Sequence, residues 1–308
     1  MIGAIERSTN ITFPGNAVHG TSPVVAVVPV GDKRGLVTLE TPFHPMDHSW
    51  PDHPADRGTI TLGSEQYPVV DCLIGAVEAD SGTVSVGADI PVRRGTEGWH
   101  WLVIHVIDSV PHDALGALAE LSVDVARRQG LSAGHTACEL VTLAINEAFT
   151  DRWRKPVPTD VLGNPDFDQL AITTSHIYPY GSRDDYRLGK SLRKKGFVSD
   201  DLAPELPQLT QRMNDLLAGW VAEDARVWVN APEPELTALR TWNCGLRRGT
   251  VTVPCGGTHV TNTGQLGDVS ISLDLTDDGT SLTMHTTVSG RQDRCSAAPA
   301  TRWSAWSG

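Results

Sequence analysis

Short β-rich runs dominate the first third of the chain and restrict it to a small sheet-based fold. Glycine, proline and aspartate separate the runs, which follow one another at the ~8–12-residue spacing typical of a small barrel or sandwich. They cover residues 23–29, 35–41, 58–62, 69–77, 82–86 and 99–106. Between the second and third runs, the segment TPFHPMDHSWPDHPADRG (41–58) is rich in proline, histidine and aspartate and predicts an irregular loop.

The patterning changes near residues 108–115, where Asp108, Pro111 and Asp113 precede apolar residues at helical spacing. This spacing predicts a helix over 113–128 and a clearer one over 132–150, with Ser132 as N-cap. A further helix is expected at 207–222, with Pro207 in its first turn. Four strands are expected at 225–230, 249–253, 269–275 and 281–288, and a proline-rich surface excursion at 152–168.

The chain therefore reads as an α+β protein of two domains, which suits 308 residues at ~150 per domain. We expect an N-terminal barrel-like β domain over residues 1–110 and an α+β metal-binding domain over 111–292. Residues 293–308 form an Ala/Ser-rich tail that Trp303 and Trp306 could tether. The oligomeric state is left open.

Charge, hydropathy and cysteine content narrow the class of protein. With 25 Lys+Arg against 37 Asp+Glu, the net charge of −12 argues against a binder that contacts nucleic acid over its whole surface. No apolar run approaches the ~20 residues of a membrane span, and the N-terminus lacks a signal-peptide pattern. We therefore expect a cytoplasmic protein. Its five cysteines are an odd number, which we interpret as reduced thiols.

Two distant segments carry residues suited to metal binding. In GHTACEL (134–140), His135 and Glu139 are four apart and would share one helix face. In PCGGTHV (254–260), Cys255 and His259 are also four apart, and the intervening glycines favour a turn in which thiolate and imidazole converge. Taken alone, the first pair could be a solvated helix face and the second segment a tight turn with a buried thiol.

Together the two segments would offer two nitrogens, one oxygen and one sulfur to a single cation. Such mixed ligation fits Zn²⁺ best, because the hard cations Mg²⁺ and Ca²⁺ do not select thiolate. If one position were open to water, the ion would lower the pKa of that water towards ~7 and supply a nucleophile for hydrolysis.

Three stretches resemble the alanyl-tRNA editing proteins, the free-standing relatives of the editing domain of alanyl-tRNA synthetase. They are ADRGTI (55–60), VDVARR followed by HTACELV (123–141), and PCGGTHVTNTGQLG (254–267). The third is the most specific, and the resemblance extends over roughly residues 24–290.

The resemblance implies a small N-terminal β-barrel followed by a zinc-binding editing domain. It also implies hydrolysis of the ester between a mischarged amino acid and tRNA for alanine. Carried over by position, His135, Cys255 and His259 match metal ligands, and Thr136 lies near the aminoacyl group. We expect Thr136 to help orient the amino acid, and Gly256, Gly257 and Thr258 to contact the substrate.

The sequence departs from this family at two places. Glu139 stands where the family has a second histidine, so it could be a ligand, a general base for water, or neither. The family's Gly-Gly-Gly-Gln stretch is missing, and the acidic segment HPMDHSWPDHP takes its place. Its His44, His48 and His53 could form a second metal site, although solvated histidines are the plainer interpretation.

A local basic patch between Arg183 and Lys195 could contact RNA phosphates, with Arg183 and Arg187 as substrate-binding residues and nearby tyrosines as a stacking platform. An ordinary solvated helix face is the alternative. The leading hypothesis is thus a zinc-dependent aminoacyl-tRNA deacylase. The alternatives are a hydrolase with the same metal site acting on a small-molecule acyl ester or amide in a specialised biosynthetic pathway, and a non-catalytic metal-binding module.

Overall fold

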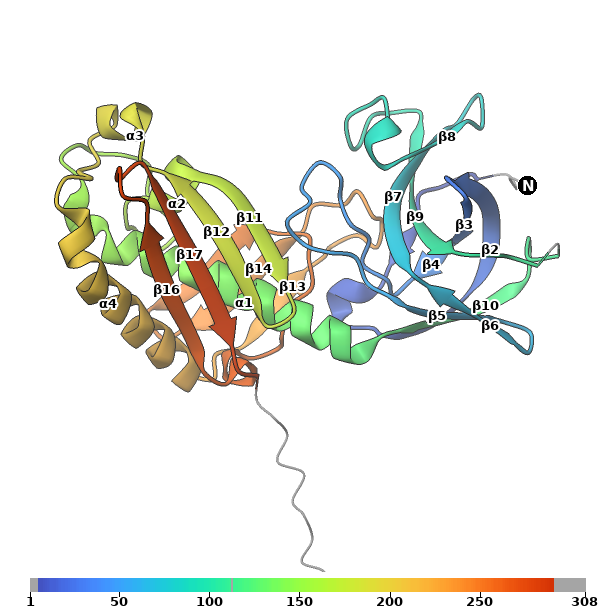
Figure 1. Cartoon of the computed structure of the whole chain (residues 1–308). Coiled ribbons are helices and arrows are strands. Elements are labelled where there is room, and N and C mark those ends of the chain that lie inside the picture. Colours follow the sequence, from blue (N-terminus) through green and yellow to red (C-terminus); the bar gives the residue numbers. More distant parts are fainter. Residues whose placement is uncertain (1–4, 112, 291–308) are drawn as a thin grey trace, which may run out of the picture.

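An eight-stranded antiparallel sheet builds the first half of the computed structural model, which describes residues 5–111 and 113–290 (Figure 1). The strands follow the order β6-β5-β10-β2-β3-β9-β7-β8. Their bounds are β2 His19–Val30, β3 Lys33–Thr38, β5 Gly58–Leu62, β6 Glu65–Val69, β7 Asp71–Glu78, β8 Val84–Val86, β9 Trp99–Ile107 and β10 Leu118–Val123. Successive residues such as Leu36 and Val37 enter different hydrophobic clusters, so both faces of the sheet are buried.

The expected mixture of strands and helices is confirmed, but the sheet is not closed into a barrel by the described residues. Strands β6 and β8 remain as its two edges. Closure would require β6 to pair on both sides, and Pro68 within β6 has no N–H to donate to a second neighbour. A separate short pairing joins β1 (Asn10–Ile11) to β4 (Glu40–Thr41) in parallel.

The expected helix over residues 113–128 is wrong at its centre, where residues 118–123 form β10, and the stretch is helical only from Val125 on. Ala119, Leu121 and Val123 are buried at every second position, between neighbours β2 and β5. Pairing with two strands outweighs the helical spacing of the apolar residues. Strand β10 belongs to the N-terminal sheet although it lies beyond residue 110. The expected domain boundary at residue 110 therefore stays a prediction.

The second helix is real but begins earlier than expected. Helix α1 spans Val125–Ala148, and the Asp124 side chain caps it by accepting from Arg127 N–H. Ser132 is therefore not the N-cap. It is buried inside the helix, and its hydroxyl donates to Thr258 Oγ1 (2.9 Å).

A four-stranded sheet in the order β11-β12-β17-β16 covers α1 and α4 in the second half (Figure 1). The three-stranded sheet β13-β14-β15 adds Trp242 and Val251 to the same core. The strands are β11 Ile172–Tyr178, β12 Gly181–Arg187, β13 Val227–Asn230, β14 Thr241–Leu246, β15 Gly249–Pro254, β16 Val269–Leu275 and β17 Ser281–Val288. The helices are α2 Phe167–Ala171, α3 Lys190–Lys194 and α4 Leu202–Ala222.

Several expectations for this half are confirmed, and β16 and β17 match residue for residue. The helix expected at 207–222 starts five residues earlier, so that Pro207 lies inside α4. Strands β11, β12 and β14 were not expected. The basic patch lies mainly on β12 and the short α3 rather than on one helix face.

Two further sequence expectations meet the structure only in part. No helix among the described residues is long and apolar enough to cross a membrane. Within residues 5–111 and 113–290, Cys72, Cys138, Cys244 and Cys255 are all free thiols. The tail 293–308, with Cys295, Trp303 and Trp306, lies outside the described residues.

Candidate metal centre

Helix α1 brings the first two candidate ligands together on one turn. His135 Nε2 lies 3.6 Å from Glu139 Oε1, and the two side chains are 8% and 22% exposed. The alternative of a solvated helix face is therefore wrong, since residues that follow β15 cover this part of α1.

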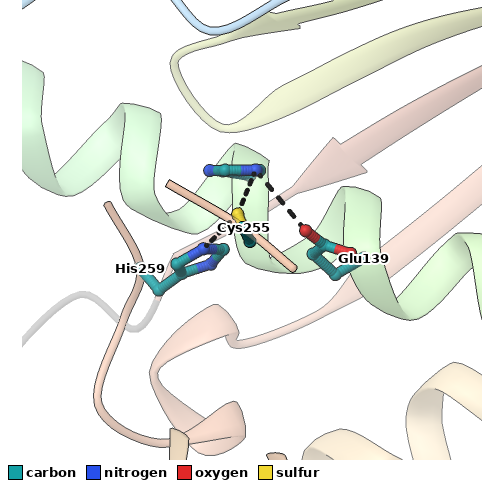
Figure 2. Close-up of side chains that lie close together, drawn as sticks. Glu139, Cys255 and His259 are labelled. Carbon is teal, nitrogen blue, oxygen red and sulfur yellow. Dashed lines mark hydrogen bonds and ion pairs between the residues drawn. The ribbon is translucent and has the colours of Figure 1, made fainter. Parts of the chain in front are cut away.

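The turn after β15 supplies the other two ligands. Cys255 Sγ lies 3.5 Å from His135 Nε2 and 3.3 Å from His259 Nε2, and Figure 2 shows Glu139, Cys255 and His259 converging. All four donor atoms lie within 4.8 Å of one another, so this cluster could hold a metal ion. Bonds of about 2.0–2.3 Å in a tetrahedral zinc site place ligand atoms about 3.3–3.8 Å apart, which agrees with the three distances.

Gly257 is needed for this approach. A Cβ at position 257 would lie 2.3 Å from Cε1 and 2.5 Å from Nδ1 of His135. The backbone N–H of Gly257 also donates to the Cys255 thiol, which acts to lower its pKa. The glycine thus provides both space for one ligand and a hydrogen bond to another.

Thr136 orients His259. The Thr136 hydroxyl donates to the Ser132 carbonyl (2.8 Å) and lies 3.2 Å from His259 Nδ1. Because its proton is already committed, Thr136 Oγ1 accepts from Nδ1–H, and the lone pair of His259 Nε2 is left for a metal. Thr136 is fully buried, so its observed contacts are with His259 and the backbone, and a contact with substrate stays a prediction.

Burial sets the electrostatics of the cluster. It lowers the pKa values of His135 and His259 well below the usual range, so both imidazoles are neutral and able to ligate. It raises the pKa of Glu139 to about 7, and burial together with Glu139 raises the pKa of the Cys255 thiol. A cation bound among these residues would stabilise the anionic forms of Glu139 and Cys255.

The histidine-rich loop does not behave as expected. His44 and His53 are only 7% and 5% exposed, so the solvated interpretation is wrong for both. Their rings pack in a row with that of the candidate ligand His135. The ring centroids of His44 and His53 are 4.4 Å apart, and those of His53 and His135 are 4.8 Å apart. The second metal site is not found, because the candidate cluster is the only such group among the described residues.

A buried ion pair holds this loop against α1. Arg128 binds the carboxylate of Asp56, and the same carboxylate accepts from His44 N–H (2.6 Å). The Arg128 guanidinium also donates to Pro42 C=O (2.7 Å), and Arg127 donates to Ala55 C=O. Sequence reasoning did not assign these roles, although both partners lie in the ADRG and VDVARR segments that had been singled out.

Of the remaining predicted site residues, one lies beside the cluster and two lie on the outer face of the sheet β11-β12-β17-β16. Thr258 is buried beside the cluster, 3.5 Å from His53 Nε2. Arg183 and Arg187 are exposed, whereas the residues between them that face α1, Asp184 and Tyr186, are buried. Because side chains alternate along a strand, the two arginines lie on the outer face and are not brought to the metal cluster.

Comparisons with known proteins add no relative to this geometry: no protein-family model matches the chain, and no curated protein matches it.

Proposed function

We propose that the chain is a metal-dependent hydrolase in which His135, Cys255 and His259 hold a zinc ion, with Glu139 as a fourth ligand that water can displace or as a base beside it. The observation that carries the proposal is the convergence of their four donor atoms within 4.8 Å. Zinc is preferred because the set combines sulfur, nitrogen and oxygen, a mixture that suits its borderline softness. The fit of the ligand spacing and the tautomer set by Thr136 support the same choice.

A zinc ion bound here would supply Lewis-acid polarisation of a carbonyl and a water of lowered pKa. The chain's own residues prepare the site for this chemistry. Thr136 and Gly257 position His259 and His135, and neighbouring histidines exclude bulk water. Glu139 is either the fourth ligand or a base that takes a proton from water, and Glu139→Gln separates the roles by their effects on zinc affinity and on turnover.

We further propose that the substrate is an aminoacyl ester, as the resemblance to alanyl-tRNA editing proteins implies. The three segments that carry the resemblance contact one another at two places along α1. Ala55 and Asp56 bind Arg127 and Arg128 at the start of α1, and Cys255 closes the cluster. Serine or glycine on tRNA for alanine is therefore the first substrate to test.

A small-molecule acyl ester or amide is the second candidate, because of where the charges lie. Arg183 and Arg187 face away from the cluster, and Asp52 lies in the loop beside it. The exposed arginines of the predicted RNA-binding patch are therefore not available to a polyanion bound at the candidate centre.

The test combines metal analysis with hydrolysis assays on the full chain. We expect zinc to copurify with the chain and the Cys255→Ala variant to lose it. Chelation should abolish deacylation of tRNA for alanine that is charged with serine or glycine. Turnover of small acyl esters without turnover of charged tRNA would favour the second candidate. Zinc binding without hydrolysis of either class would identify a non-catalytic module, and activity that survives complete metal removal would contradict the proposal.

A further inference from the structure

An arginine without a counter-ion lies beside the candidate metal centre. Arg240 is only 7% exposed, yet no carboxylate pairs with it within residues 5–111 and 113–290. The one hydrogen bond that its side chain makes to the described residues runs from Nη1 to the carbonyl of Leu236 (3.1 Å). Buried guanidinium groups normally have a paired anion, because leaving one unpaired costs free energy.

The free part of this guanidinium has a specific shape. Nε is buried and has no hydrogen-bond partner among the described residues, and Nη2 makes no hydrogen bond to them either. These two nitrogens form one edge of the planar group, from which two parallel N–H bonds can bind the two oxygens of a single oxyanion.

The turn that carries Cys255 lies against this edge. Cys255 N–H donates to the Arg240 carbonyl (3.1 Å), and a Cβ on Gly256 would lie 3.1 Å from Arg240 Nη2. Gly256 is exposed, so the missing side chain leaves room for a ligand to approach Nη2. The two glycines of the CGGTH segment thus have separate roles, one towards His135 and one towards Arg240.

The charged groups around Arg240 are a second arginine, Arg94, and the thiol of Cys255, whose anionic form favours the charged guanidinium. Arg94 donates to the same Leu236 carbonyl, and its own charge is paired with Asp47 (3.1 Å). On the other side Arg240 lies over the ring of Phe13, 5.7 Å from its centroid, and this ring contacts His44. Burial, with Arg94 nearby, lowers the pKa of Arg240 to about 10, so the group stays charged at neutral pH.

We propose that the Nε–Nη2 edge of Arg240 binds a carboxylate or phosphoryl group next to the candidate metal centre. The assignment of this anion to the substrate rests on the proposed hydrolase function, while the binding site itself does not. The substrate would then be an acyl ester or amide that carries an anionic group close to its cleaved bond. A small carboxylate-bearing molecule and the terminal phosphate of an RNA share this chemistry.

The test measures binding of inorganic phosphate and of acetate to the full chain by calorimetry, with zinc loaded and after chelation, at constant ionic strength. We expect Arg240→Gln to weaken binding about tenfold or more, since a charge-assisted pair of hydrogen bonds is lost. Arg240→Lys, which keeps the charge without the paired N–H edge, should lie between. Arg212→Gln, at an exposed arginine of α4 that pairs with Asp151, is the matched control and should bind as the unmodified chain does.

Gly256→Ala keeps the test decisive if Arg240→Gln fails to fold, because it obstructs the edge from an exposed position. Anion affinity unchanged in Arg240→Lys and Gly256→Ala, or no binding of either anion by the unmodified chain, would overturn the proposal. Tighter binding of acetate would indicate a carboxylate-bearing substrate, and tighter binding of phosphate a phosphoryl group. Arg240-dependent anion binding without hydrolysis would support the anion site and refute the proposed hydrolase function. Hydrolysis without anion affinity would support the hydrolase function and refute the anion site.

Discussion

Replacing Thr136 by valine tests whether the hydrogen bond to His259 prepares a metal ligand. Valine has nearly the same shape, so the substitution removes the hydroxyl with little change in packing. Thr136 Oγ1 lies 3.2 Å from both His259 Nδ1 and Val260 N, and both donors would lose their acceptor. Each unsatisfied buried donor costs about 1–3 kcal/mol, so the two together should lower the unfolding free energy by roughly 2–6 kcal/mol.

The effect on metal affinity should exceed a general loss of stability. Removal of a hydrogen-bond partner of a ligating histidine typically weakens metal binding about 10- to 100-fold. Zinc affinity is measured by competition with a chromogenic chelator, and urea unfolding with and without zinc reports stability. Thr136→Ser is the matched control, because it keeps the hydroxyl, and it should retain an affinity close to that of the unmodified chain. A folded Thr136→Val protein with unchanged zinc affinity would refute the reasoning.

Three further predictions follow from individual contacts. Gly257→Ala places a Cβ 2.3 Å from His135 Cε1, so we expect loss of zinc in metal analysis of a chain that is still folded by circular dichroism, and full zinc content would contradict this steric argument. Asp56→Ala leaves the buried Arg128 unpaired and should lower the unfolding free energy by about 3–5 kcal/mol in urea, whereas a loss no larger than that of a surface substitution would rule out a structural role for the pair. Burial lowers the pKa of His105 to about 4, so the unfolded chain binds the extra proton first and stability is lost as pH falls from about 6.5 to 4, by up to about 3 kcal/mol. His105→Gln should reduce that acid loss in urea titrations at pH 7 and pH 4.5, and an unchanged difference would show that His105 is not responsible.

Local sequence patterns were sufficient to predict the strands and candidate ligands that depend only on the spacing of neighbouring residues. Apolar residues at alternate positions over 269–275, and Leu282, Met284 and Val288 over 281–288, predicted β16 and β17 to the residue. The pairs His135–Glu139 and Cys255–His259 identified the candidate ligands, because spacing along a helix or a glycine turn is a local property. The same local reasoning failed at 113–128, where the apolar spacing is compatible with a helix and only pairing with β2 and β5 made β10 a strand.

The amino-acid sequence by itself determined the mixed α+β class and the four side chains with suitable donor atoms. Only the tertiary structure decided that these atoms meet, that His44 and His53 are buried beside them, and that Arg240 has no carboxylate partner among the residues that the structure describes. The physical reason is the range of the interactions. Hydrophobic periodicity and ligand spacing act within a few residues, whereas burial depends on contacts between segments more than a hundred residues apart, such as Cys255 Sγ with His135 Nε2.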